Sequence, residues 1–154
     1  MSTYAEDIRR SSCRNINDVI EWCHDALPSE WKAYPWRHPK LNHGIDLLAS
    51  DTALNCYMSA YGEMHSGKCR AAMMSFPFEQ LKGSVEIVDW GCGQGIGSAT
   101  VIDVLQQHNL LIWVKRITLI EPSPHALMRA EANISKIVGN NIEIDAHYCP
   151  VKVD

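Results

Sequence analysis

A glycine-rich segment between two apolar runs constrains the fold of this chain more than any other feature. Four of its nine glycines lie within the seven residues 91–97. Residues 85–89, ahead of this window, have the composition of a buried strand, and residues 98–108 carry the apolar spacing of a helix. Because glycine adopts positive φ and admits a ligand close to the backbone, we expect a strand–loop–helix unit that binds a small ligand.

Strands and helices are expected to alternate from residue 84 onward. The nearly continuous apolar run 85–89 is typical of a strand that is covered on both faces. A second strand is predicted over 117–120 and a third, with an edge-like alternation, over 142–146. Between them, Ser123 is a candidate helix cap, and Gly139 a candidate helix end. This order predicts an α/β fold, with a parallel sheet joined by right-handed crossovers.

Three strands are fewer than a complete doubly wound nucleotide-binding domain has. We therefore expect the chain to be an N-terminal part of a longer protein, or a protomer whose sheet is completed in an oligomer. An open sheet edge makes a homo-oligomer possible. We divide the chain into a helical N-terminal region, 1–83, and an incomplete ligand-binding domain, 84–154.

The N-terminal region is expected to be largely helical. A first helix is predicted from a cap at Asn15 or Asn17 to Pro28, followed by an irregular aromatic segment over 31–39. A second helix is predicted to start near Ser50, and we expect it to break or bend at Gly67. Three side chains share one face of this second helix: Tyr57, Tyr61 and His65.

Composition excludes several classes of protein. The chain is 46% hydrophobic and 21% charged, which is typical of a soluble globular protein. Its net charge of −4 and scattered basic residues argue against non-specific binding to nucleic acid. No apolar run has the length of about 20 residues that a membrane span needs. Six cysteines without a C-x-x-C pair or a signal peptide predict reduced thiols, a cytoplasmic location and no metal site.

The spacing of the glycines does not fit the loops that bind phosphate groups. A dinucleotide loop needs glycine or alanine at the sixth position of G-x-G-x-x-G, where this chain has Ile96 or, starting from Gly93, Ser98. A P-loop needs lysine after its last glycine, and Gly97 lacks one. Asp89, at the mouth of the loop, would repel a pyrophosphate but attract a cationic ligand. A nicotinamide-dependent oxidoreductase is therefore the least favoured interpretation.

Residues 89–95, with the sequence DWGCGQG, resemble motif I of the class I S-adenosylmethionine-dependent methyltransferases, commonly D/E-x-G-x-G-x-G. A second element is similar too: the apolar run 117–120 ends in Glu121, 26 residues beyond Gly95. The following residues, 122–127, resemble the stretch that opens the next helix in that family. The resemblance spans about residues 84–148 and implies a Rossmann-like fold.

The resemblance also implies a cofactor and its contacts. An acid at the position of Glu121 accepts hydrogen bonds from both ribose hydroxyls in that family, which its two oxygens permit. Tyr148 or His147 is a candidate for the adenine amino group, and aromatic side chains of the N-terminal region can face the sulfonium. The expected contacts of S-adenosylmethionine are Asp89, Trp90, Gly91, Cys92, Gly93, Gly95, Glu121, Pro122 and Tyr61.

The expected activity is methyl transfer from S-adenosylmethionine to an acceptor that the sequence leaves open: a small molecule, a protein or a nucleic acid. Direct displacement at the sulfonium methyl needs mostly alignment of the reacting atoms, so no catalytic base is assigned. The family's fourth strand, which often carries acceptor-orienting residues, is not in this chain. The alternative is a catalytically inactive methyltransferase-like module that serves assembly or interaction.

Overall fold

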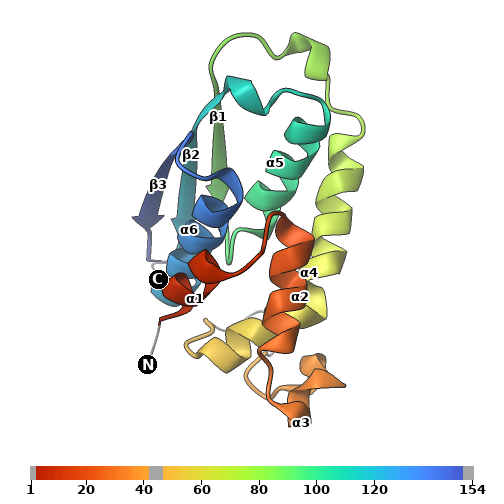
Figure 1. The fold of residues 1–154 in the computed structure, drawn as a ribbon, viewed down its shortest axis with the longest axis vertical. Helices are drawn as coiled ribbons and strands as arrows, with labels where there is room; N and C mark the ends of the chain where they lie inside the picture. The colour runs from red at the N-terminus through yellow and green to blue at the C-terminus, as the bar shows by residue number, and fades with distance from the viewer. Residues whose placement is uncertain (1–2, 42–46, 151–154) are drawn as a thin grey trace.

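The computed structural model describes residues 3–41 and 47–150. An N-terminal group of helices precedes three strands that alternate with two helices (Figure 1). In chain order the elements are α1 (Tyr4–Arg10), α2 (Ile16–Asp25), α3 (Ser29–Lys32), η1 (Pro35–Arg37), α4 (Asp51–Met73), η3 (Phe78–Gln80), β1 (Val85–Trp90), α5 (Ile96–Gln107), η4 (Leu111–Trp113), β2 (Val114–Glu121), α6 (Pro124–Val138) and β3 (Glu143–Tyr148), where η marks a 3₁₀ turn.

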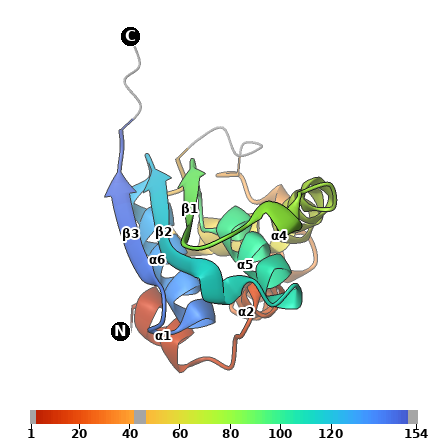
Figure 2. The same ribbon diagram turned by 90° about the horizontal axis from the view of Figure 1, so that it is seen from above.

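The three strands form one parallel sheet in the order β1-β2-β3. Each pair of neighbouring strands is joined by a helix, and both helices pack on the same side of the sheet: α5 contacts β1, and α6 contacts β2 and β3. Figure 2 shows the sheet on one side of the molecule, with α4 farther from it than α5. The predicted α/β fold with a Rossmann-like parallel sheet is therefore confirmed.

The observed elements differ from the predicted bounds by a few residues. The second strand starts at Val114, three residues before the predicted 117–120, because the turn η4 leads directly into it. The third strand covers 143–148, and the helix after the glycines begins at Ile96. Ends of elements are set by hydrogen bonds to neighbours, which hydrophobic spacing does not encode.

The expectation that β1 is covered on both faces is wrong. Its exposure alternates strictly along the strand, and Val88 and Trp90 lie on the face away from the helices, with Trp90 73% exposed. Both right-handed crossovers bring their helices to one face, so among the described residues the other face carries no helix. The apolar side chains at positions 88 and 90 hid this alternation in the sequence.

The helix α4 is continuous from Asp51 to Met73, so the predicted break at Gly67 is wrong. The Ser50 side chain caps its first turn by accepting a hydrogen bond from Ala53 N. Nothing lies within 4 Å of a Cβ placed on Gly67, so neighbouring segments do not distort the helix there. An isolated glycine costs a helix only about 1 kcal/mol, which packing on α2 and α5 offsets.

The N-terminal helices pack directly on the α/β part. Asn15 caps α2, as predicted, and its side chain accepts a hydrogen bond from Asp18 N. The helix α1 contacts α6, and α2 contacts both α4 and α5. The segment predicted to be irregular, 31–39, includes the end of α3 and the turn η1. One core contains residues of both parts, and the division between residues 83 and 84 stays a prediction.

In the part of the chain that the structure describes, no helix combines the length and the apolar character needed to cross a membrane. All six cysteines are free thiols: Cys13, Cys23, Cys56, Cys69, Cys92 and Cys149.

Candidate functional site

The glycine-rich segment lies at the C-terminal end of β1, next to the end of β2. Two backbone amides attach its start to the neighbouring strand: Gly91 N donates to Ile120 O at 2.8 Å, and Cys92 N donates to the same oxygen at 3.1 Å. Gly95 N then closes a turn on Cys92 O at 2.8 Å. The loop is thereby fixed at the sheet edge where parallel α/β folds bind their ligands.

The first two glycines of the loop combine an unusual backbone with open space. Gly91 has a φ of +69° and Gly93 a φ of +54°, conformations that residues with a side chain rarely adopt. Among the described residues, and apart from each glycine's own chain neighbours, no atom lies within 4 Å of a Cβ placed on either residue. Neighbouring atoms therefore do not explain why these positions are glycine. The backbone conformation does, and it leaves the space beside both residues available to a ligand.

The last two glycines of the loop pack against other elements. Gly95 has a φ of +83°, and a Cβ there would lie 3.3 Å from both Ala130 Cα and Ile134 Cγ1 of α6. A Cβ on Gly97 would lie 3.3 Å from Asp89 Oδ2. These two positions bring α5 close to α6 and to the end of β1.

Asp89 points to the side of the sheet that carries the helices, where it caps α5. Its Oδ2 accepts hydrogen bonds from Ser98 N at 3.1 Å and from Ser98 Oγ at 2.7 Å. The N-terminus of a helix attracts negative charge, and in dinucleotide-binding folds this is the position of the pyrophosphate. In this chain a carboxylate already occupies it, which disfavours a phosphate and favours a cation.

Glu121 is buried, with 7% of its surface exposed, and anchors two loops. Its Oε2 accepts a hydrogen bond from Gly93 N and its Oε1 accepts one from Ser123 N, both at 2.9 Å. The resemblance suggested only a ligand contact, so this anchoring role was not predicted. A carboxylate has about four acceptor positions, and two remain for the hydroxyl groups of a ligand.

The helix α4 places an aromatic face beside the loop. The ring centroid of Tyr57 lies 5.2 Å from that of Tyr61 and 6.0 Å from that of His65, and Tyr57 Oη lies 3.3 Å from His65 Nε2. Burial, then the neighbouring Tyr61 and Glu121, raise the pKa of Tyr57. Farther along α4, Cys69 Sγ donates to Gly97 O at 3.8 Å. Tyr57 of this face therefore lies near Glu121, and Cys69, farther along the same helix, contacts the first turn of α5.

Other predicted contacts point elsewhere. Trp90 lies on the helix-free face of the sheet, opposite to Asp89. The Cys92 thiol is buried in the core, and burial, followed by Asp89 and Glu121, raises its pKa to about 12. Pro122 is half-buried after Glu121, and Tyr148 is exposed opposite Glu121 in the β2–β3 register. Through its side chain, Trp90 does not join the Asp89–Glu121 group, whereas the buried Cys92 thiol lies near both carboxylates.

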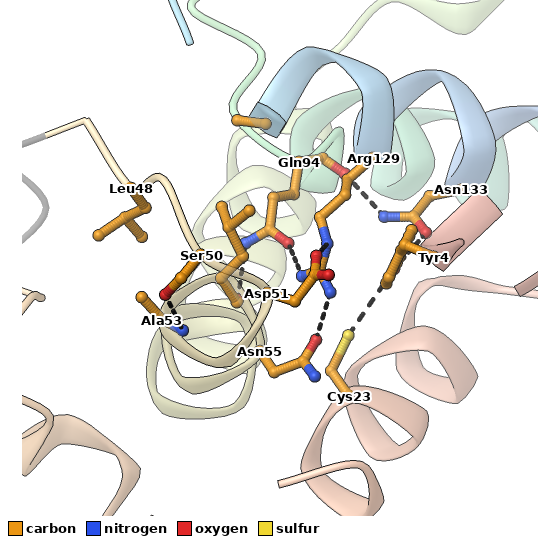
Figure 3. Close-up of polar contacts among 12 residues, drawn as sticks. Tyr4, Cys23, Leu48, Ser50, Asp51, Ala53, Asn55, Gln94, Arg129 and Asn133 are labelled. Carbon is orange, nitrogen blue, oxygen red and sulfur yellow. Dashed lines mark hydrogen bonds and ion pairs between the residues drawn. The ribbon is translucent and has the colours of Figure 1, made fainter. Parts of the chain in front are cut away.

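A buried polar cluster behind the loop was missed in the sequence. Gln94 Nε2 donates to Leu54 O at 2.9 Å, Gln94 Oε1 accepts from Arg129 Nη1 at 2.8 Å, and Gln94 O accepts from Asn133 Nδ2 at 3.0 Å. Figure 3 shows Gln94, Arg129 and Asn133 together. One signal was available: Arg129 and Asn133, four residues apart, share one face of α6 beside its apolar residues.

The site therefore consists of an open glycine backbone between two carboxylates, with an aromatic helix face beside it. Glu121 supplies acceptors for hydroxyl groups, and Asp89 supplies negative charge for a cation. Asp89 also neutralises the N-terminus of α5. No model of a known protein family, no curated protein and no solved structure matches this chain.

Proposed function

We propose that this chain binds S-adenosylmethionine for methyl transfer, as a methyltransferase or as the cofactor-binding part of one. The observation that carries the proposal is Asp89, whose carboxylate lies at the N-terminus of α5 and against the glycine loop. A loop of this type with a negative charge at that position suits an adenosyl ligand with a cationic end better than a dinucleotide.

The residues fit this ligand in three ways. The space beside Gly91 and Gly93 is open, so a flat adenosyl group can approach the backbone closely. Glu121 keeps two acceptor positions for vicinal hydroxyls, as a ribose requires. The rings of Tyr57 and Tyr61 offer electron-rich faces to a sulfonium or an ammonium.

When bound, the cofactor supplies a methyl group on a positively charged sulfur, which a nucleophile can attack directly. The chain's own contribution is to bind and orient the cofactor: Glu121 orients the ribose, and Asp89 attracts the positive charge. Orientation alone lowers a displacement barrier substantially, so no catalytic base is assigned. The acceptor is a small molecule, a protein side chain or a nucleic acid. The free thiols suit a reducing compartment, and we place the chain in the cytoplasm.

Calorimetric titration with S-adenosylmethionine and S-adenosylhomocysteine tests the proposal. We expect binding of both and a loss of about tenfold or more in Glu121→Gln, since one acceptor oxygen becomes a donor. Because Glu121 also anchors the loop, the titration is repeated with ligands that lack the 2′- or 3′-hydroxyl. If Glu121 binds the ribose, its substitution affects these ligands less.

The matched control is Glu131→Gln, an exposed glutamate on α6 that makes no ion pair with any residue of 3–41 or 47–150. It is expected to bind like the wild type. Absence of binding at millimolar ligand, with a folded protein, would contradict the proposal. So would equal affinities of wild type and Glu121→Gln for every ligand.

A second candidate function is favoured by the helix-free face of the sheet. Val88 and Trp90 are exposed there, and in the described part both outer strands have one unpaired edge. Exposed edges and apolar faces promote association, so a catalytically inactive module that assembles with a second copy is the alternative. Sedimentation velocity over a range of concentrations tests it. Methyl transfer from labelled cofactor to any acceptor would contradict it.

A further inference from the structure

Arg129, on α6, is a fully buried arginine that joins three other elements. Its Nη1 donates to Gln94 Oε1 in the glycine loop, and its Nη2 donates to Asn55 Oδ1 of α4 at 2.6 Å. Its guanidinium carbon lies 3.7 Å from the ring centroid of Tyr4 in α1 (Figure 3). An arginine without any exposed surface is rare in proteins, so its position requires an explanation.

The charge of Arg129 is only partly balanced. Among the described residues its ion-pair partner is Asp51, at 3.4 Å from Nε, and the Asp51 side chain is 70% exposed. Nε itself is buried and has no hydrogen-bond partner in the part of the chain that the structure describes. Burial accordingly lowers the pKa of Arg129. Buried ionic groups of this kind contribute little to stability compared with an apolar core, so stability does not account for this one.

The contacts of Arg129 lead to the glycine loop. Gln94 lies between Gly93 and Gly95, and its side chain is held on one side by Arg129 and on the other by Leu54 O. Asp51 and Asn55 belong to the first turns of the same helix, α4, that supplies Leu54. A rigid guanidinium fork therefore sets the distance between the start of α4 and the loop.

We propose that Arg129 is a positioning residue for the ligand loop: it holds Gln94 so that Gly91, Gly93 and Gly95 keep the conformation that receives the ligand, and Asp51 orients Arg129 from the first turn of α4. The importance of the loop for S-adenosylmethionine rests on the proposed function. The chain of contacts from Asp51 through Arg129 to the loop does not depend on the proposed function.

The first experiment uses the ligand-free protein and Asp51→Asn, a variant at an exposed position that keeps the Ser50 cap. Hydrogen exchange of the amides of Gly93 and Gly95, both hydrogen-bonded, is followed by NMR together with the amides of β2. We expect the two loop amides to exchange about two- to fivefold faster relative to β2, the range that a partly exposed ion pair supports. The control is Asp7→Asn, in the first turn of α1.

Equal acceleration of the loop and of β2 in Asp51→Asn would overturn the proposal, because a loss of general stability affects both. Loop rates unchanged from the wild type, or equal to those of Asp7→Asn, would overturn it too. Faster exchange confined to the loop supports it. None of these outcomes depends on the ligand.

The second experiment uses Arg129→Lys, which keeps the charge and loses the fork. We expect S-adenosylhomocysteine to bind about tenfold more weakly, with the loop amides exchanging faster relative to β2 than in Asp51→Asn. If Arg129→Lys does not fold, S-adenosylhomocysteine is titrated into Asp51→Asn instead. We then expect the affinity of this variant to be about two- to fivefold lower than that of the wild type. Binding unchanged in the folded variant would overturn the proposal. If the wild type does not bind, the proposed function fails, and the exchange experiment still decides the role of Arg129.

Discussion

The four glycines of the loop form two pairs, Gly91 with Gly93 and Gly95 with Gly97, and each pair requires glycine for a different structural reason. Gly91, Gly93 and Gly95 all have positive φ, but only Gly91 and Gly93 have open space beside them among the described residues. A Cβ on Gly95 or Gly97 would lie 3.3 Å from another atom. The first half of the loop therefore leaves its backbone open, as the proposed ligand requires, and the second half joins α5 to α6 and to Asp89. A count of glycines cannot separate these roles, but substitution can.

The largest effect is expected for Gly95→Ala. A side chain at a φ of +83°, with its Cβ 3.3 Å from Ala130 Cα, combines backbone strain with contact against a backbone atom that cannot move away. Together these terms predict a loss of about 2–5 kcal/mol in the free energy of unfolding. Urea unfolding followed by circular dichroism measures it.

The matched control for that substitution is Gly67→Ala. Gly67 lies in the interior of α4, and a Cβ there has nothing within 4 Å. Alanine is favoured over glycine in a helix, so an increase of about 0.5–1 kcal/mol is expected. If Gly95→Ala is as stable as the wild type, the division of the loop into two halves is wrong.

Gly93→Ala is expected to act on the ligand more than on the fold. Its φ of +54° adds a strain of about 1–2 kcal/mol, and among the described residues beyond its chain neighbours no atom lies within 4 Å of the added methyl group. The methyl group would instead occupy space that the proposed ligand uses. Affinity for S-adenosylhomocysteine should fall by roughly tenfold, which corresponds to about 1.4 kcal/mol. Calorimetry on the folded variant measures it, and unchanged affinity would place the ligand elsewhere.

Asp89→Asn tests whether the negative charge at the N-terminus of α5 stabilises the helix and attracts the cationic ligand. The amide keeps an oxygen for Ser98 but loses the interaction of a carboxylate with the N-terminus of α5. A decrease of about 1 kcal/mol in the free energy of unfolding is expected. Affinity for S-adenosylmethionine should also fall, about fivefold, or about 1 kcal/mol. Thermal unfolding and calorimetry separate the two effects. A stronger binding of the cationic ligand would show that Asp89 does not attract it.

Much of the fold follows from local patterns. The alternation of strand and helix after residue 84, with the candidate cap at Ser123, is sufficient to predict a parallel α/β sheet. The helix starts at Asn15 or Asn17 and near Ser50 are predicted as well, and the structure has caps at Asn15 and Ser50. Each cap forms within its own first turn, so a single sequence contains the necessary information. Asp89 is singled out by its charge at the mouth of the loop, and Glu121 by the resemblance of residues 117–121 to the second element of the methyltransferase family; their contacts with a ligand stay predictions.

The rest depends on contacts between distant segments. The buried position of Arg129 arises from α1, α4 and the glycine loop together, and the spacing within α6 does not specify these partners. Similarly, the anchoring role of Glu121 depends on how the backbone turns at Gly93. Coverage of β1 is a property of the whole sheet, so the strand's own apolar residues misled the prediction.

The smallest effect is expected for Trp90→Ala, which tests from which side the ligand reaches the loop. Trp90 directly precedes Gly91, but its side chain is 73% exposed on the face of the sheet opposite to Asp89. Removing an exposed side chain changes the free energy of unfolding by about 0.5 kcal/mol or less. If the ligand lies between Asp89 and Glu121, its affinity should stay within about twofold of the wild type, equivalent to less than about 0.5 kcal/mol. A loss as large as that of Gly93→Ala would mean that the indole covers the cofactor, and that the open half of the loop receives its ligand from the helix-free face.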